Sequence, residues 1–337
     1  MKPTDLSYHL TNYLSIYLPG TQGLSSNTIA SRRDAFVLLL GFLREKKGMT
    51  IEKVQINSLT IKLIDDFLTW LENERGCSVS TRNQRLASIK AFFKYLQSKT
   101  PEHILLCQQI MSMPLKKTFT KTIRYMTLEA VKAILDSIVP NTKNGYRDLV
   151  LLSVLYDSGA RVQEIADLVV GDIRLGKPET IRLTGKGKKR RIVPMMEPTA
   201  QLLSQYLARN NLNDTQHKQY PLFCNRSGRK LTRGGISYVV KKYANLAREA
   251  HPALIPDVVS AHHFRHSKAF HMLGAGVPLI YIRDFLGHEE ISTTEVYARC
   301  DSKMKREAFE LAYCDMQSRK TVWHQNDNLL SWLKSLC

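Results

Sequence analysis

The regular spacing of apolar residues breaks down between Gln108 and Thr122, and this break divides the chain into two parts. Pro114 interrupts the segment, and several lysines follow it. A stretch without periodicity does not continue a packed helix, so each part needs a core of its own. With 337 residues, 43% of them apolar, the chain can fill two cores. We therefore expect a domain at 1–107, a basic linker at 108–122 and a second domain from 123 onward.

The first part reads as a series of amphipathic helices, because its apolar residues recur with a period near 3.6 residues. One helix is predicted from a cap at Ser25 to a stop at Gly48, and another from Thr60 to Gly76. A third helix, starting near Ser80, keeps its apolar residues on one stripe. Its basic residues point elsewhere, and they are Arg82, Arg85, Lys90 and Lys94. Such a basic face is usually just solvated, and the alternative is contact with an anionic partner.

The second part is predicted to be mostly helical with a small sheet. A helix begins at Thr127, and a turn ending at Arg161 starts another. Between Thr180 and Pro194, two short alternating runs flank a basic turn that contains glycine, which predicts a β-hairpin. The helical pattern returns after Leu231. The expected fold class is therefore mainly α, with one small β-sheet in the second domain.

The charge of the chain indicates a large polyanionic partner, because a formal net charge of +19 exceeds what solubility requires. Nucleic acid is favoured over a membrane surface. The six cysteines lack the paired spacing of a zinc site or a disulfide framework. The longest apolar run is too short to span a bilayer. We expect a cytoplasmic protein without a membrane partner.

Two arginines, two histidines and a tyrosine supply the groups needed to hold and attack a phosphodiester. They are Arg161, His262, Arg265, His288 and Tyr297. Guanidinium groups bind two nonbridging oxygens in bidentate fashion. An imidazole beside the phosphate can act as a general base near neutral pH. A phenol, whose pKa is about 10, needs nearby cations to become a useful nucleophile.

These residues also have plainer interpretations. Arg161 could form a surface ion pair with Glu164, one turn later on the same helix, or Glu164 could hold the guanidinium of Arg161 toward an anion. The helix start would then also direct free backbone N–H groups at that anion. His288 could cap a helix, and Tyr297 could be a core aromatic. Taken singly, the residues leave these alternatives open.

Three strings in the second part resemble the tyrosine recombinase, or phage integrase, family. They run from Leu155 to Ile165, from His262 to Ser267 and from Leu286 to Tyr297. The last contains Gly287-His288 followed by Ser292-Thr293-Thr294. Phe264 replaces a leucine common in related sequences, a change that should affect packing only. His263 and His266 compete with His262 as the base, and the resemblance selects His262 because its spacing to Arg265 is the family's.

The resemblance implies a role for each residue. Tyr297 would be the nucleophile, Arg161 and Arg265 would bind the phosphate, His262 would take the tyrosine proton, and His288 would donate a hydrogen bond. A hairpin lysine would protonate the leaving oxygen. Lys186 matches that lysine, and Lys188 and Lys189 are close enough to be confused with it. Contacts to DNA are expected from Arg82, Arg85, Lys90, Lys94, Lys188 and Lys189.

The resemblance also implies an architecture and partners. A SAM-like helical core-binding domain and a mixed α/β catalytic domain at 123–318 would form a C-shaped clamp on DNA, with neither a metal nor another cofactor. A tail at 319–337 would dock into a neighbouring protomer of a homotetramer assembled on paired sites. Accessory DNA-bending proteins or a partner recombinase could assist it at the nucleoid.

The implied activity is site-specific recombination of an Xer-like or transposon-borne kind. It would serve integration and excision of a mobile element or resolution of chromosome dimers. Two alternatives remain open. One is a type IB topoisomerase, which rejoins the same strand, and the other is a noncatalytic DNA-binding regulator with the same fold.

Overall fold

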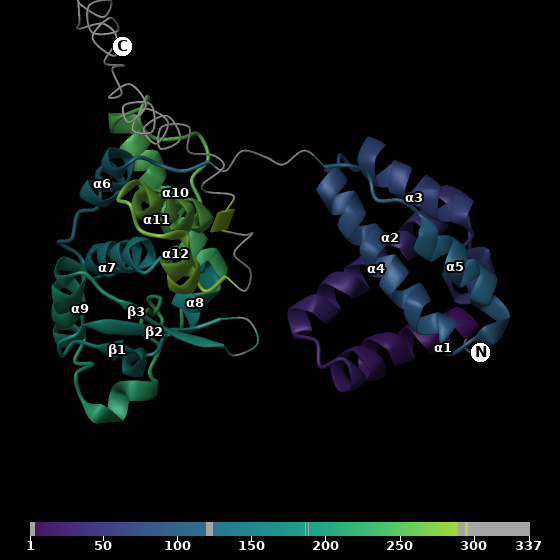
Figure 1. The fold of residues 1–337 in the computed structure, drawn as a ribbon, viewed down its shortest axis with the longest axis horizontal. Coiled ribbons are helices and arrows are strands. Elements are labelled where there is room, and N and C mark those ends of the chain that lie inside the picture. Colours follow the sequence, from purple (N-terminus) through teal and green to yellow (C-terminus); the bar gives the residue numbers. More distant parts are fainter. Residues whose placement is uncertain (1–3, 119–123, 186, 188, 289–293, 296–337) are drawn as a thin grey trace, which may run out of the picture. The chain divides into compact units, whose positions relative to one another are not determined.

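The computed structural model of the protein describes residues 4–118, 124–185, 187, 189–288 and 294–295. The chain forms two compact units, 1–121 and 122–337, each with its own hydrophobic core. Both are mainly helical, and the second contains a small sheet, as predicted (Figure 1). No helix in the described part of the chain is both long and apolar enough to cross a membrane.

The first unit consists entirely of helical segments and the turns that join them, as far as it is described. Its helices are α1 (Asp5–Asn12), a π-helical segment (Tyr13–Thr21), α2 (Ser26–Lys47), α3 (Ile61–Asn73), α4 (Val79–Gln97) and α5 (Ile104–Ser112). The starts predicted at Ser25 and Thr60 are confirmed, because each hydroxyl accepts an N–H from the first turn of its helix. The third helix was predicted from Ser80, and its capping hydroxyl is that of Ser78. The sequence pattern did not reveal α1 or the π-helical segment.

The core of the first unit centres on α4, which packs against α2, α3 and α5. Phe92 and Phe93 of this helix are fully buried, and the ring of Phe92 lies 5.0 Å from that of Phe36 on α2. Three neighbouring helices leave little of α4 exposed to solvent. This packing changes the interpretation of its basic residues.

The expectation that the four basic side chains of α4 all point away from the core is wrong for Arg82, which is only 5% exposed. Arg85 donates to the carbonyl of Ser31 at 3.1 Å, and Lys90 donates to the carbonyl of Met113. Of the four, only Lys94 is exposed. The prediction failed because α4 packs against α2 and α5, and this packing covers faces that an isolated amphipathic helix would expose to solvent.

The expected start of the linker, Gln108, lies within α5. This helix continues to Ser112, and Met113 after it is buried in the core of the first unit. Lys116 exchanges two backbone hydrogen bonds with the side chain of Asn83. The segment up to Lys116 therefore belongs to the first unit, and its low apolar periodicity reflects a short helix rather than a tether.

The second unit surrounds the buried helix α7. Its helices are α6 (Leu128–Asp136), α7 (Lys143–Asp157), α8 (Val162–Asp167), α9 (Glu197–Arg209), α10 (Arg233–Ala250), α11 (Ala261–Gly274) and α12 (Leu279–Leu286). Helix α7 contacts α6, α8, α9 and α11. Its apolar stretch from Leu149 to Leu155 is buried almost throughout, which explains the continuous apolar run in the sequence.

The sheet is a three-stranded antiparallel meander of β1 (Ile173–Arg174), β2 (Thr180–Thr184) and β3 (Arg190–Pro194). The predicted hairpin is confirmed, with Thr184 paired to Arg190 at the end of the ladder next to the turn. Figure 1 shows β2 and β3 extending as a hairpin away from α6, α10 and α11. Ile181, Leu183 and Val193 face the core, and alternate residues face outward.

Candidate active site

The turn between α7 and α8 places Arg161 at the start of α8. Gly159 in this turn has φ +55°, and a Cβ atom there would lie 3.0 Å from the side chain of Leu286, so only glycine fits. Arg161 then caps α8 in an extended conformation. Its side chain is 36% exposed, which leaves part of the guanidinium open to solvent.

Glu164 holds Arg161 by both its side chain and its backbone. Nη1 of Arg161 donates to Oε1 of Glu164 at 2.9 Å, and the backbone N–H of Arg161 donates to Oε2 at 2.8 Å. The predicted contact between the two side chains is therefore present. That backbone N–H is not free to face an anion, contrary to the expectation, because the carboxylate occupies it.

A third arginine, Arg191 on β3, shares the same carboxylate. Its Nη1 and Nη2 donate to the two oxygens of Glu164, each at 2.8 Å. Two guanidinium groups lower the pKa of this buried carboxyl to about 2, against the opposing effect of burial. Sequence reasoning missed Arg191, because it follows a basic turn whose charges were expected to contact DNA phosphates. Its place on the inward face of a strand is the one signal that could have identified it.

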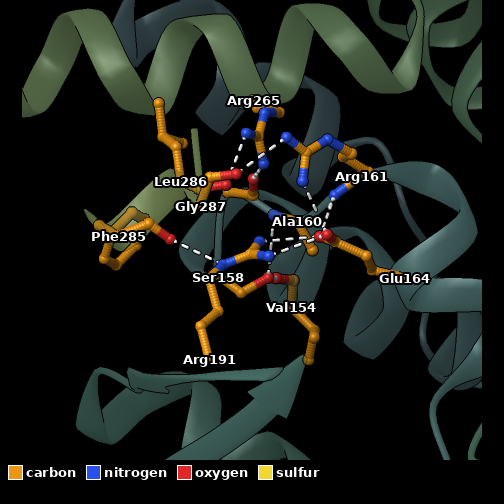
Figure 2. Close-up of polar contacts among 11 residues, drawn as sticks. Val154, Ser158, Ala160, Arg161, Glu164, Arg191, Arg265, Phe285, Leu286 and Gly287 are labelled. Carbon is orange, nitrogen blue, oxygen red and sulfur yellow. Dashed lines mark hydrogen bonds and ion pairs between the residues drawn. The ribbon is translucent and has the colours of Figure 1, made fainter. Parts of the chain in front are cut away.

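Arg265 on α11 is only 3% exposed and binds two carbonyl groups. Nη1 donates to the carbonyl of Gly159 at 2.7 Å, and Nη2 donates to that of Leu286 at 2.7 Å. The first bond ties Arg265 to the turn that carries Arg161. The two arginines selected from the sequence therefore meet at one place, as Figure 2 shows.

Three arginines bind three successive carbonyls at the C-terminal end of α12. Arg191 donates through Nε to Phe285 at 2.9 Å, Arg265 to Leu286 at 2.7 Å, and Arg161 to Gly287 at 3.1 Å (Figure 2). The last carbonyls of a helix lack partners within the helix and carry partial negative charge, so cations bind well there. This arrangement, here called the arginine cluster, fixes the helix end that directly precedes His288.

His288 follows the left-handed cap residue Gly287, and its backbone N–H donates to the carbonyl of Arg283. Its Nδ1 lies 2.9 Å from Oγ1 of the buried Thr294, which belongs to the threonine pair singled out in the sequence. Burial, followed by the charges of Arg265, Arg161 and Arg191, lowers the pKa of His288 to about 4. The imidazole is therefore neutral near pH 7, where it can still donate one N–H.

His262 and Arg265 lie one turn apart on α11, which confirms that their segment is helical. Desolvation and the charges of Arg265, Arg161 and Arg233 lower the pKa of His262, so its neutral form can accept a proton near pH 7. The competing His263 accepts the backbone N–H of Ser260 at 3.0 Å in the capping box of α11. The ring of His263 therefore helps to cap the start of α11. Among His262, His263 and His266, only His262 is exposed to solvent.

Lys186, Lys188 and Tyr297 lie outside the described residues, as does the tail at 319–337. The residue before Lys186 is described. A Cβ atom on Gly185 would lie 3.1 Å from Oε1 of Glu164, so the hairpin begins beside the arginine cluster. Lys189 is exposed, and its carbonyl accepts the N–H of Gly185 at 2.8 Å. Within the described residues, no group of three histidine, cysteine or acidic side chains could hold a metal ion.

Comparison with known proteins gives two matching family descriptions. Residues 124–304 match the phage integrase family, and residues 17–102 match the N-terminal SAM-like domain of phage integrases. A protein of Sinorhizobium fredii, provisionally named an integrase/recombinase, is 34% identical over 93% of this chain and 92% of its own. The tyrosine recombinase XerC of Myxococcus xanthus is 32% identical over 92% of this chain and 99% of its own.

Solved structures share the fold at lower sequence identity. The integrase of the transposon Tn1549, in complex with transposon right end DNA, matches with a TM-score of 0.66 and 16% identity. That match covers 91% of this chain and 98% of the other. The recombinase XerH bound to its difH substrate matches with a TM-score of 0.63 and 22% identity, over 83% of this chain and 78% of the other.

Proposed function

Because this chain belongs to the phage integrase family of tyrosine recombinases, and is a site-specific recombinase, we propose that it cuts and rejoins DNA through a covalent 3′-phosphotyrosyl intermediate. The observation that supports this chemistry best is the arginine cluster. Arg161 and Arg265 bind adjacent carbonyls, so a single phosphate could reach both guanidinium groups. His288, whose lowered pKa keeps it neutral near pH 7, directly follows Gly287 at the same helix end.

In the proposed reaction, the phenol oxygen of Tyr297 attacks the scissile phosphorus and the bond to the 5′ oxygen breaks. His262 accepts the phenolic proton, and Lys186 gives a proton to the departing oxygen, so charge and atoms balance. Arg161 and Arg265 stabilise the added negative charge of the pentavalent state. His288 donates a hydrogen bond to a nonbridging oxygen of the phosphate.

The covalent adduct conserves the energy of the phosphodiester bond, so rejoining needs no external energy source. A 5′ hydroxyl of a second duplex attacks the phosphotyrosine, releases Tyr297 and joins the strands. Two such rounds pass through a Holliday junction and require two DNA sites. The proposed partner is therefore double-stranded DNA with paired sites, bound by a homotetramer. Integration and excision of a mobile element, or resolution of chromosome dimers, would use this same reaction.

Covalent trapping tests the proposal. The purified chain is incubated without metal with labelled DNA fragments from the flanks of its own gene, denatured in detergent and resolved by size. Wild type should give a retarded labelled band, and Tyr297→Phe should give none. Tyr281→Phe is the matched control, because Tyr281 is an exposed tyrosine on α12 and its loss should leave the band intact. A band that persists in Tyr297→Phe would disprove the assigned nucleophile.

Adduct formation, read together with relaxation of supercoiled DNA and strand exchange between paired sites, separates the two alternatives. A type IB topoisomerase would form the adduct and relax supercoiled DNA without paired sites, whereas a recombinase exchanges strands only between two sites. A noncatalytic regulator would bind the fragments without forming any adduct. The arginine cluster favours a catalytic centre, because its side chains are held in place by Glu164 and by backbone carbonyls.

A further inference from the structure

Arg191 differs from Arg161, the more exposed of the two arginines assigned to the phosphate, because its side chain is turned into the protein. All three of its guanidinium nitrogens donate within the chain, two to Glu164 and one to the carbonyl of Phe285. The side chain is 13% exposed, whereas that of Arg161 is 36% exposed. A substrate could therefore reach Arg161 directly, while Arg191 can act only through the residues that it holds.

The first of these residues is Glu164, whose two oxygens each accept one bond from Arg191 and one from Arg161. This sharing fixes the plane of the carboxylate. It also means that the charge of Glu164 is divided between two guanidinium groups. Without Arg191, the carboxylate would neutralise Arg161 alone, and the guanidinium would attract a phosphate less strongly.

The second contact of Arg191 is the helix end before His288. The carbonyl of Phe285 accepts its Nε, and a Cβ atom on Gly287 would lie 3.0 Å from both its Cδ and its Nη1. Arg191 therefore packs against the residue that immediately precedes His288. One side chain thus fixes both a phosphate-binding arginine and the turn that presents the imidazole.

From these contacts we infer that Arg191 is a positioning residue for strand cleavage, acting through Glu164 on Arg161 and through the end of α12 on His288. The inference rests on the proposed function, since it concerns the geometry of that same reaction. It assigns to β3 a direct part in the active site, beyond carrying the hairpin lysines.

The first test replaces Arg191 by lysine, which keeps the charge but cannot span both oxygens of Glu164 and reach Phe285. Arg182→Lys is the matched control. Arg182 lies on the adjacent strand β2 and binds Asp172 through Nε and Nη2, both at 2.8 Å, away from the arginine cluster. Single-turnover adduct formation should slow by about 10–100-fold in Arg191→Lys, a typical loss for a residue that orients reacting groups. DNA affinity should stay within about twofold.

The matched control should cleave at the wild-type rate. An Arg191→Lys protein that cleaves as fast as Arg182→Lys would overturn the inference. A double variant adds a second criterion. Because one of its two routes runs through Glu164, the combination of Glu164→Gln with Arg191→Lys should lose less than the product of the two single losses. Losses that multiply would show that Arg191 acts independently, against the inference.

A measurement without DNA keeps the inference separate from the proposed function. The charge of Arg191 contributes to the lowered pKa of His288, which is about 4. In Arg191→Met, the ring proton signal of His288, assigned with a His288→Asn variant, should titrate at higher pH in NMR spectra. Arg182→Met should not change it. If wild type forms no adduct, the proposed function fails, whereas this titration still tests whether Arg191 lies against the turn that presents His288. An unchanged His288 titration would overturn that part of the inference.

Discussion

At the scale of single residues, the site depends on neutral imidazoles beside fixed cations. His266, one turn after His262 on α11, shows that such an arrangement makes the stability of the fold depend on pH. Burial, followed by the charges of His262, His263 and Arg265, lowers the pKa of His266 to about 4, whereas a histidine in the unfolded chain titrates at about 6.5. Between these two pH values, the unfolded chain binds a proton that the folded chain excludes.

Lowering the pH from 7 to 4 should therefore reduce the free energy of unfolding, most steeply below about pH 6.5. Each kcal/mol lost should lower the melting temperature of a domain of this size by about 2–4 °C. His266→Asn should flatten the dependence of melting temperature on pH, and part of it should remain because His288 acts with the same sign. Calorimetric melts at four pH values measure these slopes.

His251, an exposed histidine at the end of α10, provides the control for this series. His251→Asn should leave the slope unchanged. A slope that is the same in wild type and in His266→Asn would show that His266 is protonated equally in the folded and unfolded chain, contrary to the expectation.

Some residues of the site could be predicted from the sequence, and others could not. His262 and Arg265 share a face of α11 because i and i+3 are neighbours on any helix, and spacing is visible in a sequence. The carbonyl partners of the arginines are not visible, because backbone groups carry no sequence signature. Arg191 acquires its role only when β3 and α12 come together in the folded chain.

At the scale of elements, the end of α12 depends on one glycine. Gly287 has φ +65°, a conformation that costs other residues about 1–2 kcal/mol, and a Cβ atom there would press against Arg191. Gly276 provides a comparison, since it has φ +80° but open space around its missing side chain. The two glycines therefore separate backbone strain from steric conflict.

Gly276→Ala should lower stability by about 1–2 kcal/mol and leave DNA cleavage unchanged. Gly287→Ala should lose more stability and also slow adduct formation, because Arg191 and the turn before His288 must move apart. Denaturant melts and single-turnover cleavage measure both effects. Equal losses in the two variants would mean that the contact with Arg191 contributes nothing beyond backbone strain.

Element prediction succeeded where local signals suffice. A cap at Ser25 marked the start of α2, the apolar period placed the starts of α3 and α4 to within about two residues, and alternation around a glycine turn marked the hairpin. It failed for β1, which has two residues and hence no period, and for the end of α5 at Ser112. The burial of Arg82 was also missed, because tertiary packing on three sides overrides the helical stripe.

At the scale of the whole molecule, the excess of 49 basic over 30 acidic residues should dominate the affinity for DNA. A protein that neutralises six to ten phosphates loses about 1,000- to 100,000-fold in affinity between 50 and 200 mM salt. We expect a loss of that order here, measured by fluorescence anisotropy over a salt series. Lys94→Ala, which removes the exposed cation of α4, should reduce the logarithmic slope by about 1.

Arg82→Gln is the contrasting variant, because it removes a charge from the same helix at a buried position. It should leave the salt slope unchanged. If Arg82→Gln reduces the slope and Lys94→Ala does not, then burial in the free protein is a poor guide to which face of α4 meets DNA.

Assembly is the last property that belongs to the whole molecule. The segment after Lys320 contains Trp332 and several leucines, a set of apolar groups too short to form a core of its own. We propose that it docks into a neighbouring protomer. Deletion of residues 321–337 should therefore spare binding to a single site and abolish cooperative binding to paired sites in a gel-shift titration. Replacement of Lys334 and Ser335 by alanine keeps the apolar groups and should retain cooperativity. If the truncated chain still binds paired sites cooperatively, the protomers must contact one another through the described units instead.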